Sequence, residues 1–177
     1  MTRSAELQAV LSAIPADFAA PSADYRAVRK MFAPFHGHPV ADDCVIEIVE
    51  PGGVRCGSYR LRGTTPDLLA LHCHGGALVS CPLDVYHFYA EMIARQTGCA
   101  VVMPDYRLAP EHPYPAAHDD CFHAYRGLLA SGRDPQHIVL LGESCGGLLA
   151  IGLMLRARDE GLPLPRCFVS LTGWFDL

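Results

Sequence analysis

The chain has 177 residues, of which 50% are hydrophobic and 19% are charged, and its formal net charge is −5. These proportions exclude a disordered chain, and the scattered Lys and Arg residues argue against a nucleic-acid partner. No stretch reaches the ~18 consecutive apolar residues that a membrane-spanning helix needs. Glu6 and Asp17 interrupt any signal-peptide core. The length suits one globular domain, and we expect no membrane span.

Eight cysteines are scattered along the chain, and no two of them form a C-x-x-C pair. Most lie inside apolar runs, whereas a disulfide scaffold is typical of shorter secreted chains. We therefore expect free, mostly buried thiols in a reducing compartment. Together with the lack of a signal-peptide pattern, this predicts a cytoplasmic protein.

The first 40 residues have a helical pattern that prolines then break. An apolar stripe at helical spacing is formed by Leu7, Val10, Leu11 and Ile14. A second short helix is expected over residues 22–32, with Ser22 as its N-cap. These pieces lack a core of their own, so we expect residues 1–40 to pack against the larger unit formed by residues 41–177.

From residue 44 onward, short apolar runs alternate with helical segments. The expected strands are 44–49, 54–61, 68–73, 99–103, 137–141 and 167–171. The expected helices are 83–97, 116–131 and 145–158. The Pro51-Gly52-Gly53 turn predicts that the first two strands form an antiparallel pair. The later buried strands, separated by helices, are typical of an α/β fold with a mostly parallel sheet covered on both faces.

The strongest motif is Gly142-Glu143-Ser144-Cys145-Gly146, which directly follows an expected strand and directly precedes an expected helix. In this context G-x-S-x-G indicates a nucleophile elbow, in which serine occupies a strained turn and the glycines allow close backbone approach. The Ser144 hydroxyl would project at a helix N-terminus, where backbone N–H groups favour negative charge. The alternative is a Gly-rich turn that holds a serine by chance.

Cys145 is a rival nucleophile within the same motif. Centring the elbow on Cys145 would place Glu143 where glycine is needed for clearance. We therefore expect Cys145 to contribute its backbone N–H, as the residue that follows the nucleophile.

The segment His74-Gly75-Gly76-Ala77 follows the expected strand 68–73. An H-G-G-G-type loop at this place supplies backbone N–H donors to a tetrahedral oxyanion. Ala77 replaces the last glycine of that pattern, and alanine keeps the N–H but resists a positive φ. His74 is expected to brace this loop rather than to act as a catalytic base.

Residues 105–116 read DYRLAPEHPYPA and follow another expected strand. The density of prolines excludes a helix or a central strand, so we expect an ordered loop. Asp105, Arg107 and Glu111 are expected to brace it through ion pairs that fix the neighbouring loops, rather than to take part in catalysis.

In their order and spacing, the HGGA, DYRLAPEHPYPA and GESCGG segments resemble the hormone-sensitive-lipase-like group of α/β-hydrolases, the bacterial family IV esterases. The resemblance covers about residues 40–177, and residues 1–40 are similar to the N-terminal cap helices of that group. The chain departs from the group's commoner residues at Ala77, Glu143 and Cys145.

The resemblance implies a serine carboxylesterase or lipase-like hydrolase that acts on short to medium acyl esters without a metal or cofactor. Ser144 would be the nucleophile. The oxyanion hole would be formed by Gly75, Gly76, Ala77 and Cys145. The partner would be a small-molecule ester, and a homodimer of the full-length protein is kept open.

In this fold the catalytic acid and histidine follow the serine along the chain. Only 33 residues follow Ser144 (177 − 144 = 33), and none of them is a histidine. The acids among them, Asp159, Glu160 and Asp176, do not match the triad acid of the group. We therefore expect an α/β-hydrolase core that runs through the sixth strand and lacks the last two strands, the C-terminal helices, and the triad acid and histidine. Substitution by an internal histidine is not favoured; the candidates are His72, His74, His112, His118 and His123.

Two consequences are expected of this chain. The sixth strand would be an unprotected apolar sheet edge, and esterase turnover would be low without a base.

Two other functions remain open on the same scaffold. One is non-catalytic binding of a small ligand, as in the plant gibberellin receptors that resemble this group, and the other is hydrolysis of amides or lactones.

Overall fold

The computed structural model describes residues 4, 8 and 24–175. The predicted apolar stripe at residues 7–14, the predicted N-cap Ser22, and Asp176 lie outside the described residues.

The six predicted strands are present, and each begins and ends within two residues of its predicted position. They are β1 (Cys44–Val49), β2 (Cys56–Leu61), β3 (Leu69–Cys73), β4 (Ala100–Pro104), β5 (Ile138–Glu143) and β6 (Cys167–Leu171). The described α-helices are α2 (Tyr25–Phe32), α3 (His87–Thr97), α4 (Ala116–Ala130) and α5 (Cys145–Asp159). Short 3-10 turns are η1 (Ala33–Phe35), η2 (Pro51–Gly53), η3 (Leu83–Val85) and η4 (Pro135–His137).

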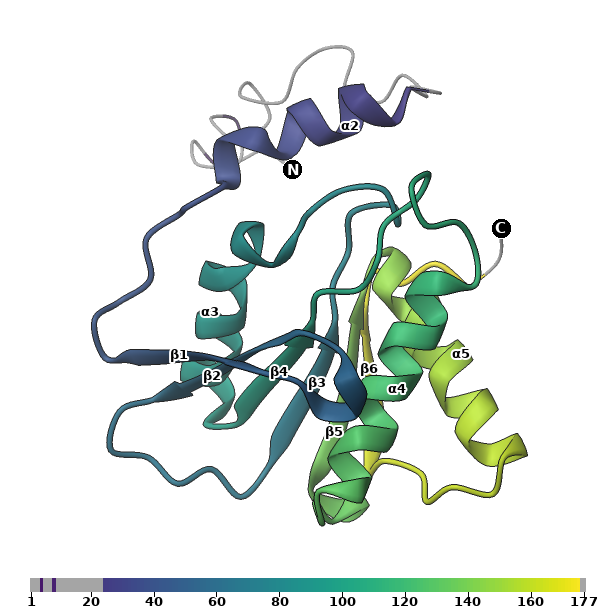
Figure 1. The fold of residues 1–177 in the computed structure, drawn as a ribbon. Helices are drawn as coiled ribbons and strands as arrows, with labels where there is room; N and C mark the ends of the chain where they lie inside the picture. The colour runs from purple at the N-terminus through teal and green to yellow at the C-terminus, as the bar shows by residue number, and fades with distance from the viewer. Residues whose placement is uncertain (1–3, 5–7, 9–23, 176–177) are drawn as a thin grey trace.

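The strands form one mixed sheet in the order β1-β2-β4-β3-β5-β6 (Figure 1). β1 and β2 form the predicted antiparallel hairpin, and β2 pairs antiparallel with β4. The remaining strands are parallel, and Cys73 at the end of β3 pairs with Gly142 near the end of β5. The segments that follow these two strands therefore leave the same edge of the sheet side by side.

The hairpin turn between β1 and β2 packs against the backbone of α4. Gly52 has a φ of +64°, and a Cβ there would lie 2.1 Å from the His123 carbonyl oxygen. A Cβ on Gly127 of α4 would lie 2.0 Å from the Gly52 nitrogen. Glycine is required on both sides of this contact because no side chain fits between the two backbones.

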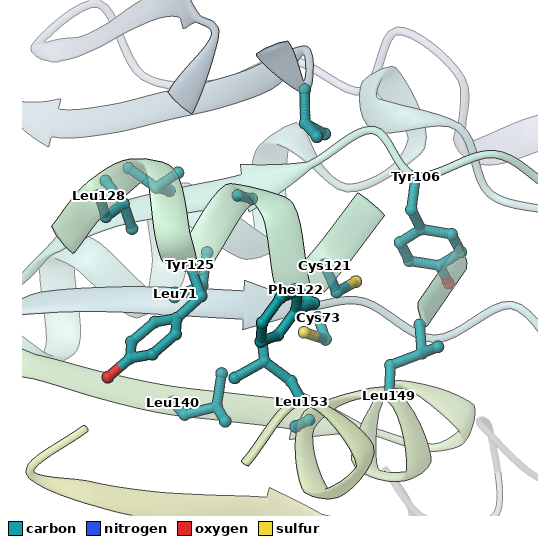
Figure 2. Close-up of a cluster of buried hydrophobic side chains, with 14 of the residues drawn as sticks. Leu71, Cys73, Tyr106, Cys121, Phe122, Tyr125, Leu128, Leu140, Leu149 and Leu153 are labelled. Carbon is teal, nitrogen blue, oxygen red and sulfur yellow. The ribbon is translucent and has the colours of Figure 1, made fainter. Parts of the chain in front are cut away.

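Helices cover both faces of the sheet, with α3 on one face and α4 and α5 on the other (Figure 1). Successive residues of β3 face opposite layers, as strand geometry requires. Leu71 belongs to the apolar cluster with α4 and α5 that Figure 2 shows, whereas Ala70 packs with residues of α3. None of the described helices has the length and apolarity to cross a membrane.

Two predicted helix boundaries differ from the structure. α2 begins at Tyr25, and its N-cap is Asp24, whose carboxylate accepts a hydrogen bond from the Arg26 N–H at 2.9 Å. The observed N-cap is thus Asp24 in place of the predicted Ser22, which lies outside the described residues, and Asp caps a helix as well as Ser does. The predicted helix 83–97 is divided at Tyr86 into η3 and α3.

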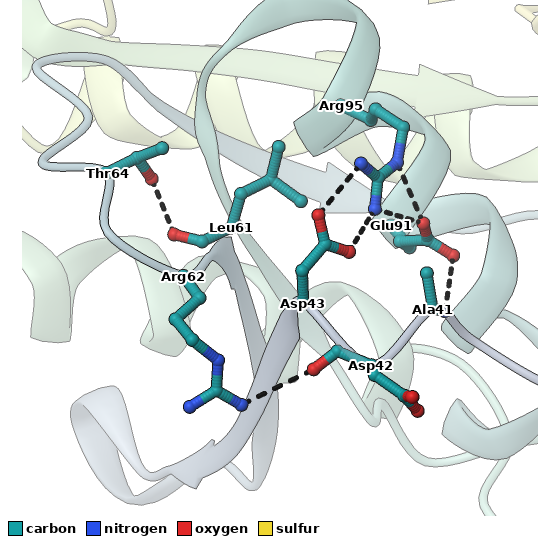
Figure 3. Close-up of polar contacts among 8 residues, drawn as sticks. All are labelled: Ala41, Asp42, Asp43, Leu61, Arg62, Thr64, Glu91 and Arg95. Carbon is teal, nitrogen blue, oxygen red and sulfur yellow. Dashed lines mark hydrogen bonds and ion pairs between the residues drawn. The ribbon is translucent and has the colours of Figure 1, made fainter.

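Arg95 of α3 anchors the segment through which the chain enters the sheet (Figure 3). Its guanidinium donates to both carboxylate oxygens of Asp43, at 2.5 and 3.1 Å, and to Glu91 Oε1. Glu91 in turn accepts a hydrogen bond from the Ala41 N–H at 3.3 Å. The hydrogen bond from Arg95 lowers the pKa of Asp43, so this carboxylate stays ionised and the contact holds at neutral pH.

All eight cysteines are free thiols, and six of them are buried. This agrees with the expectation of free, mostly buried thiols; the exceptions are Cys44, which is half-buried, and Cys167 on β6, which is exposed.

The two edges of the sheet differ in their protection. The edge strand β1 carries Glu47, whose carboxylate forms an exposed ion pair with Arg60 of β2 at 3.7 Å. Among the described residues β6 pairs only with β5, and Val169 is 40% exposed. An edge strand that presents apolar side chains without charges favours pairing with another chain.

We therefore expect the 177-residue chain to self-associate through β6 in a concentration-dependent manner. Val169→Lys should shift the association to higher concentration, because a lysine on an edge strand disfavours strand pairing. Ile48→Lys, at the half-exposed position on β1, is the matched control and should change little. Sedimentation velocity over a concentration series measures the effect. A monomer at every concentration, or an equal effect of the two variants, would contradict this expectation.

Candidate active site

Ser144 lies between the end of β5 and the start of α5, in a backbone conformation that non-glycine residues rarely adopt. Its φ is 52° and its ψ is −126°. Hydrogen bonds on both sides hold this conformation. The Ser144 N–H donates to the Leu171 carbonyl at 3.0 Å, and the Ser144 carbonyl accepts from the N–H groups of Gly147 and Trp174, each at 3.0 Å. Strained backbone of this kind persists only where the surroundings fix it, as at many active sites.

The glycines on either side of Ser144 are required by close backbone contact. A Cβ on Gly142 would lie 2.6 Å from the Gly146 carbonyl oxygen. A Cβ on Gly146 would lie 1.9 Å from the Cys73 carbonyl oxygen and 2.7 Å from that of His74. The start of α5 therefore lies directly against the end of β3, and the turn at Ser144 is held beside the segment 74–77.

The segment 74–77 turns sharply through three consecutive residues with positive φ. Gly76 has a φ of +114°, and a Cβ there would lie 2.5 Å from the Ser80 carbonyl oxygen. Ala77 and Leu78 follow with φ values of 56° and 63°. The predicted conflict at Ala77 is therefore real, because the left-handed conformation costs an alanine about 1–2 kcal/mol.

Several backbone N–H groups meet at this place. In the described part of the chain, no acceptor receives the N–H of Gly75 or Gly76. Cys145 is the first residue of α5, so its N–H has no partner within the helix. An anion beside Ser144 would meet these donors together with the positive end of the α5 dipole.

The Cys145 side chain is fully buried beneath the segment 74–78. Burial raises the pKa of its thiol, although hydrogen bonds from the backbone of Leu78 and Ala77 act in the opposite direction. A buried thiol with a raised pKa is a poor nucleophile, because the thiolate is the reactive form. The geometry thus favours Ser144, which is half-buried, over Cys145 as the reacting group.

His74 packs beneath its own loop. Its ring stacks on Tyr106 with centroids 4.1 Å apart, and its Nδ1 donates to the Gly75 carbonyl at 2.8 Å. The Tyr106 hydroxyl donates to the His74 carbonyl at 2.9 Å. Burial lowers the pKa of His74 to about 4, so the imidazole is neutral at pH 7. These contacts suit a bracing residue.

Two of the predicted bracing residues pair with partners outside the segment 105–116. Arg107 donates to Asp120 of α4 at 2.8 Å through Nη2, and its backbone N–H donates to the same carboxylate at 2.8 Å. Asp105 forms an ion pair with Arg55, and it accepts a hydrogen bond from the Leu83 N–H at 3.3 Å. The sequence does not identify Arg55 and Asp120, because they are distant along the chain.

Glu111, the third of these residues, is held by Arg29 of α2. The Arg29 guanidinium donates to both Glu111 oxygens, at 2.8 and 2.6 Å. It also donates to the Val79 carbonyl at 2.7 Å and to the Ala109 carbonyl at 3.1 Å. One side chain thus links α2, the turn that follows Ala77, and the proline-rich loop. The hydrogen bonds from Arg29 lower the pKa of Glu111 to about 2, so the pair is ionised at neutral pH.

A cavity of about 460 Å³ lies beside Ser144, between α2 and α3. It is lined by Phe32, Phe35, Val85, Tyr86, Phe88, Tyr89, Glu143, Leu171 and Thr172. Glu143 precedes Ser144 in the chain, and Leu171 accepts the Ser144 N–H. The cavity therefore adjoins the elbow, and the N-terminal helix contributes to its wall.

No described histidine is hydrogen-bonded to Ser144. The described residues also contain no cluster of three or more His, Cys, Asp or Glu side chains that could hold a metal ion.

Comparison with known proteins places this arrangement in context. A family model described as alpha/beta hydrolase fold matches residues 70–177. An esterase of Acinetobacter venetianus is 34% identical over 132 residues, which are 75% of this chain and 43% of the esterase. An acetyl-hydrolase of Streptomyces hygroscopicus is 36% identical over 107 residues, which are 60% of this chain and 36% of that protein. The chain thus spans less than half the length of these curated relatives.

Solved structures show the same likeness. An esterase from the bacterial hormone-sensitive lipase family superposes with a TM-score of 0.88 and 36% identity, over 99% of this chain and 60% of the other. EstE5, in a crystal soaked with p-nitrophenyl butyrate, superposes with a TM-score of 0.83 and 33% identity, over 96% of this chain and 57% of the other.

The contact between α5 and β3 predicts an asymmetry between two glycines of the same helix. Gly146→Ala should destabilise the fold by about 1–3 kcal/mol or more, because its Cβ would overlap the Cys73 carbonyl. Gly152→Ala is the matched control. Its Cβ would meet only the His118 ring, at 3.1 Å, and alanine favours the helix. Urea unfolding followed by circular dichroism measures both variants, and equal stabilities would contradict the contact.

The Arg29 contacts predict that this side chain helps to hold α2 in place. Arg29→Ala and Glu111→Gln should each speed amide hydrogen exchange in residues 25–35 and in the turn at residues 76–80. Arg26→Ala is the control, because the Arg26 guanidinium lies 3.9 Å from Asp24 in an exposed pair. Exchange measured by mass spectrometry tests this. Unchanged exchange in both variants, or the same change in Arg26→Ala, would show that Arg29 does not hold α2.

Proposed function

The chain belongs to the alpha/beta hydrolase family, and from this premise we propose that it carries the nucleophile and the oxyanion loop of a serine carboxylic-ester hydrolase. The observation that supports the proposal most directly is the strained, half-buried Ser144 at the start of α5, held beside N–H groups of Gly75 and Gly76 that have no acceptor among the described residues. Similarity to esterases and to an acetyl-hydrolase supports an ester as the substrate.

Ser144 would attack the ester carbonyl carbon through its Oγ. A C–O bond forms between Ser144 and the acyl group, and the hydroxyl proton passes to a general base. The protonated base then gives this proton to the leaving alcohol. In the second half, water attacks the acyl carbonyl and gives a proton to the base, and that proton returns to the Ser144 oxygen as the carboxylic acid is released. A serine hydroxyl is a weak nucleophile at its own pKa, so this sequence of steps depends on a base.

The N–H groups of Gly75, Gly76 and Cys145 would stabilise the tetrahedral intermediate. Each donor of this kind can lower the barrier by about 3–4 kcal/mol, because it is already oriented before charge develops. The Ala77 N–H is predicted to belong to the same set, at a residue whose φ of 56° strains the backbone.

The cavity beside the elbow would receive one of the two parts of the ester. Phe32 and Phe35 come from the N-terminal segment, as expected for a cap over the substrate. Leu78 and Val79 of the neighbouring turn are not among the residues that line this cavity. Its volume of about 460 Å³ accommodates a short to medium acyl chain or a comparable alcohol.

Ser144 is predicted to be the group that reacts with a fluorophosphonate. Prolonged incubation of the 177-residue chain should attach the phosphonyl group to Ser144, because the oxyanion donors act even without a base. Peptide mass spectrometry locates the adduct. Ser144→Ala should abolish it, and Cys145→Ala should retain it. Modification of another residue, or of none, would favour a non-catalytic ligand-binding role on this fold.

Turnover by these 177 residues is predicted to be slow, since no histidine follows Ser144. Loss of the base lowers kcat by roughly four to six orders of magnitude in serine hydrolases. Hydrolysis of p-nitrophenyl butyrate, corrected for the Ser144→Ala background, measures this. A rate typical of an intact esterase would mean that an internal histidine serves as the base.

A further inference from the structure

The lining of the cavity beside the elbow is mostly aromatic. Five of its lining residues are aromatic: Phe32, Phe35, Tyr86, Phe88 and Tyr89. Its one formally charged lining residue among those described is Glu143. Aromatic faces carry negative partial charge, so a cation that packs on the face of one of these rings would meet the same electrostatic sign as at the carboxylate.

Glu143 has no cationic partner in the described part of the chain. Its Oε2 accepts a hydrogen bond from the Tyr86 hydroxyl at 2.8 Å, and no Lys, Arg or His side chain forms an ion pair with it. Burial and the nearby carboxylate raise the pKa of Tyr86, so the phenol stays a neutral donor. A half-buried carboxylate without a counter-charge is costly, and one neutral hydrogen bond offsets this cost only in part.

The two imidazoles that contact the Tyr86 ring do not supply the missing positive charge. His72 and His74 contact the Tyr86 ring, with centroids 6.1 and 5.1 Å away. Burial lowers their pKa values to about 3 and about 4, so both are neutral at pH 7. Neither imidazole therefore offsets the charge of the Glu143 carboxylate.

We propose that this aromatic cavity binds a cationic nitrogen, and that the ester substrates of this site carry an ammonium group near the ester bond. The inference rests on the proposed hydrolase function for the substrate class, but the binding itself does not require catalysis. Aromatic rings arranged around a cavity recognise ammonium groups through cation–π interactions. The Glu143 carboxylate adds a direct charge partner that a neutral alkyl chain could not use.

The position of Glu143 gives the cation a second effect. A Cβ on Gly75 would lie 3.0 Å from Glu143 Oε1, so the carboxylate lies against the oxyanion loop. Its negative charge would oppose the charge that develops on the substrate oxygen. A bound ammonium group offsets this repulsion, whereas an anionic substrate group would increase it.

Binding to the 177-residue chain tests the inference without hydrolysis. Butyrylcholine and its uncharged carbon isostere, 3,3-dimethylbutyl butyrate, differ by one atom and one charge. Affinities measured by saturation-transfer NMR at pH 7 should favour butyrylcholine by about tenfold or more. Glu143→Gln should remove most of this preference and leave the affinity for the isostere nearly unchanged. Glu50→Gln, at an exposed carboxylate after β1, is the matched control.

A second variant keeps the test decisive if Glu143→Gln does not fold. Phe88→Leu removes one aromatic face and keeps the carboxylate, and it should weaken butyrylcholine more than the isostere. Equal affinity of the wild-type chain for the two ligands would overturn the inference. Fluorophosphonate modification of Ser144 in the same sample separates the two claims, because it tests the nucleophile whether or not the cavity prefers a cation.

Discussion

At the start of α5, the Gly146 backbone lies so close to the Cys73 carbonyl that a Cβ there would be 1.9 Å from its oxygen. This contact joins the segments that leave β3 and β5, two neighbouring parallel strands in register at Cys73 and Gly142. It fixes the distance between the serine turn and the oxyanion loop by backbone alone. Side chains therefore need only to orient groups whose separation is already set.

The strain at Ser144, Ala77 and Leu78 is compatible with this arrangement because neighbouring groups hold it. The Ser144 backbone is tied to β6 and to Trp174, and the oxyanion loop rests on the His74–Tyr106 stack. Arg29 extends the same support to α2, which lines the cavity. Contacts that fix reactive groups before substrate binds are the main way in which an active site lowers a barrier.

The sheet and the elbow were largely predictable because their signals are local. Buried apolar runs marked the strands, and the glycines around Ser144 marked a close approach. The ion-pair partners were not predictable, since Arg29 lies 82 positions from Glu111 and Asp120 lies 13 from Arg107. The helix start at Asp24 was missed because Ser22 and Asp24 are equally good caps. The charge of the cavity could not be predicted, because only the fold shows that Glu143 has no cationic partner among the described residues.

The central claim is that Ser144 and the oxyanion loop form one reaction centre. A crystal structure of the fluorophosphonate adduct tests it most directly, since the phosphonyl oxygen imitates the tetrahedral oxyanion. We predict that this oxygen accepts hydrogen bonds from the N–H groups of Gly75 or Gly76 and Cys145, at about 2.7–3.1 Å. A phosphonyl oxygen that points to solvent, or towards the Glu143 side of the cavity, would contradict the account.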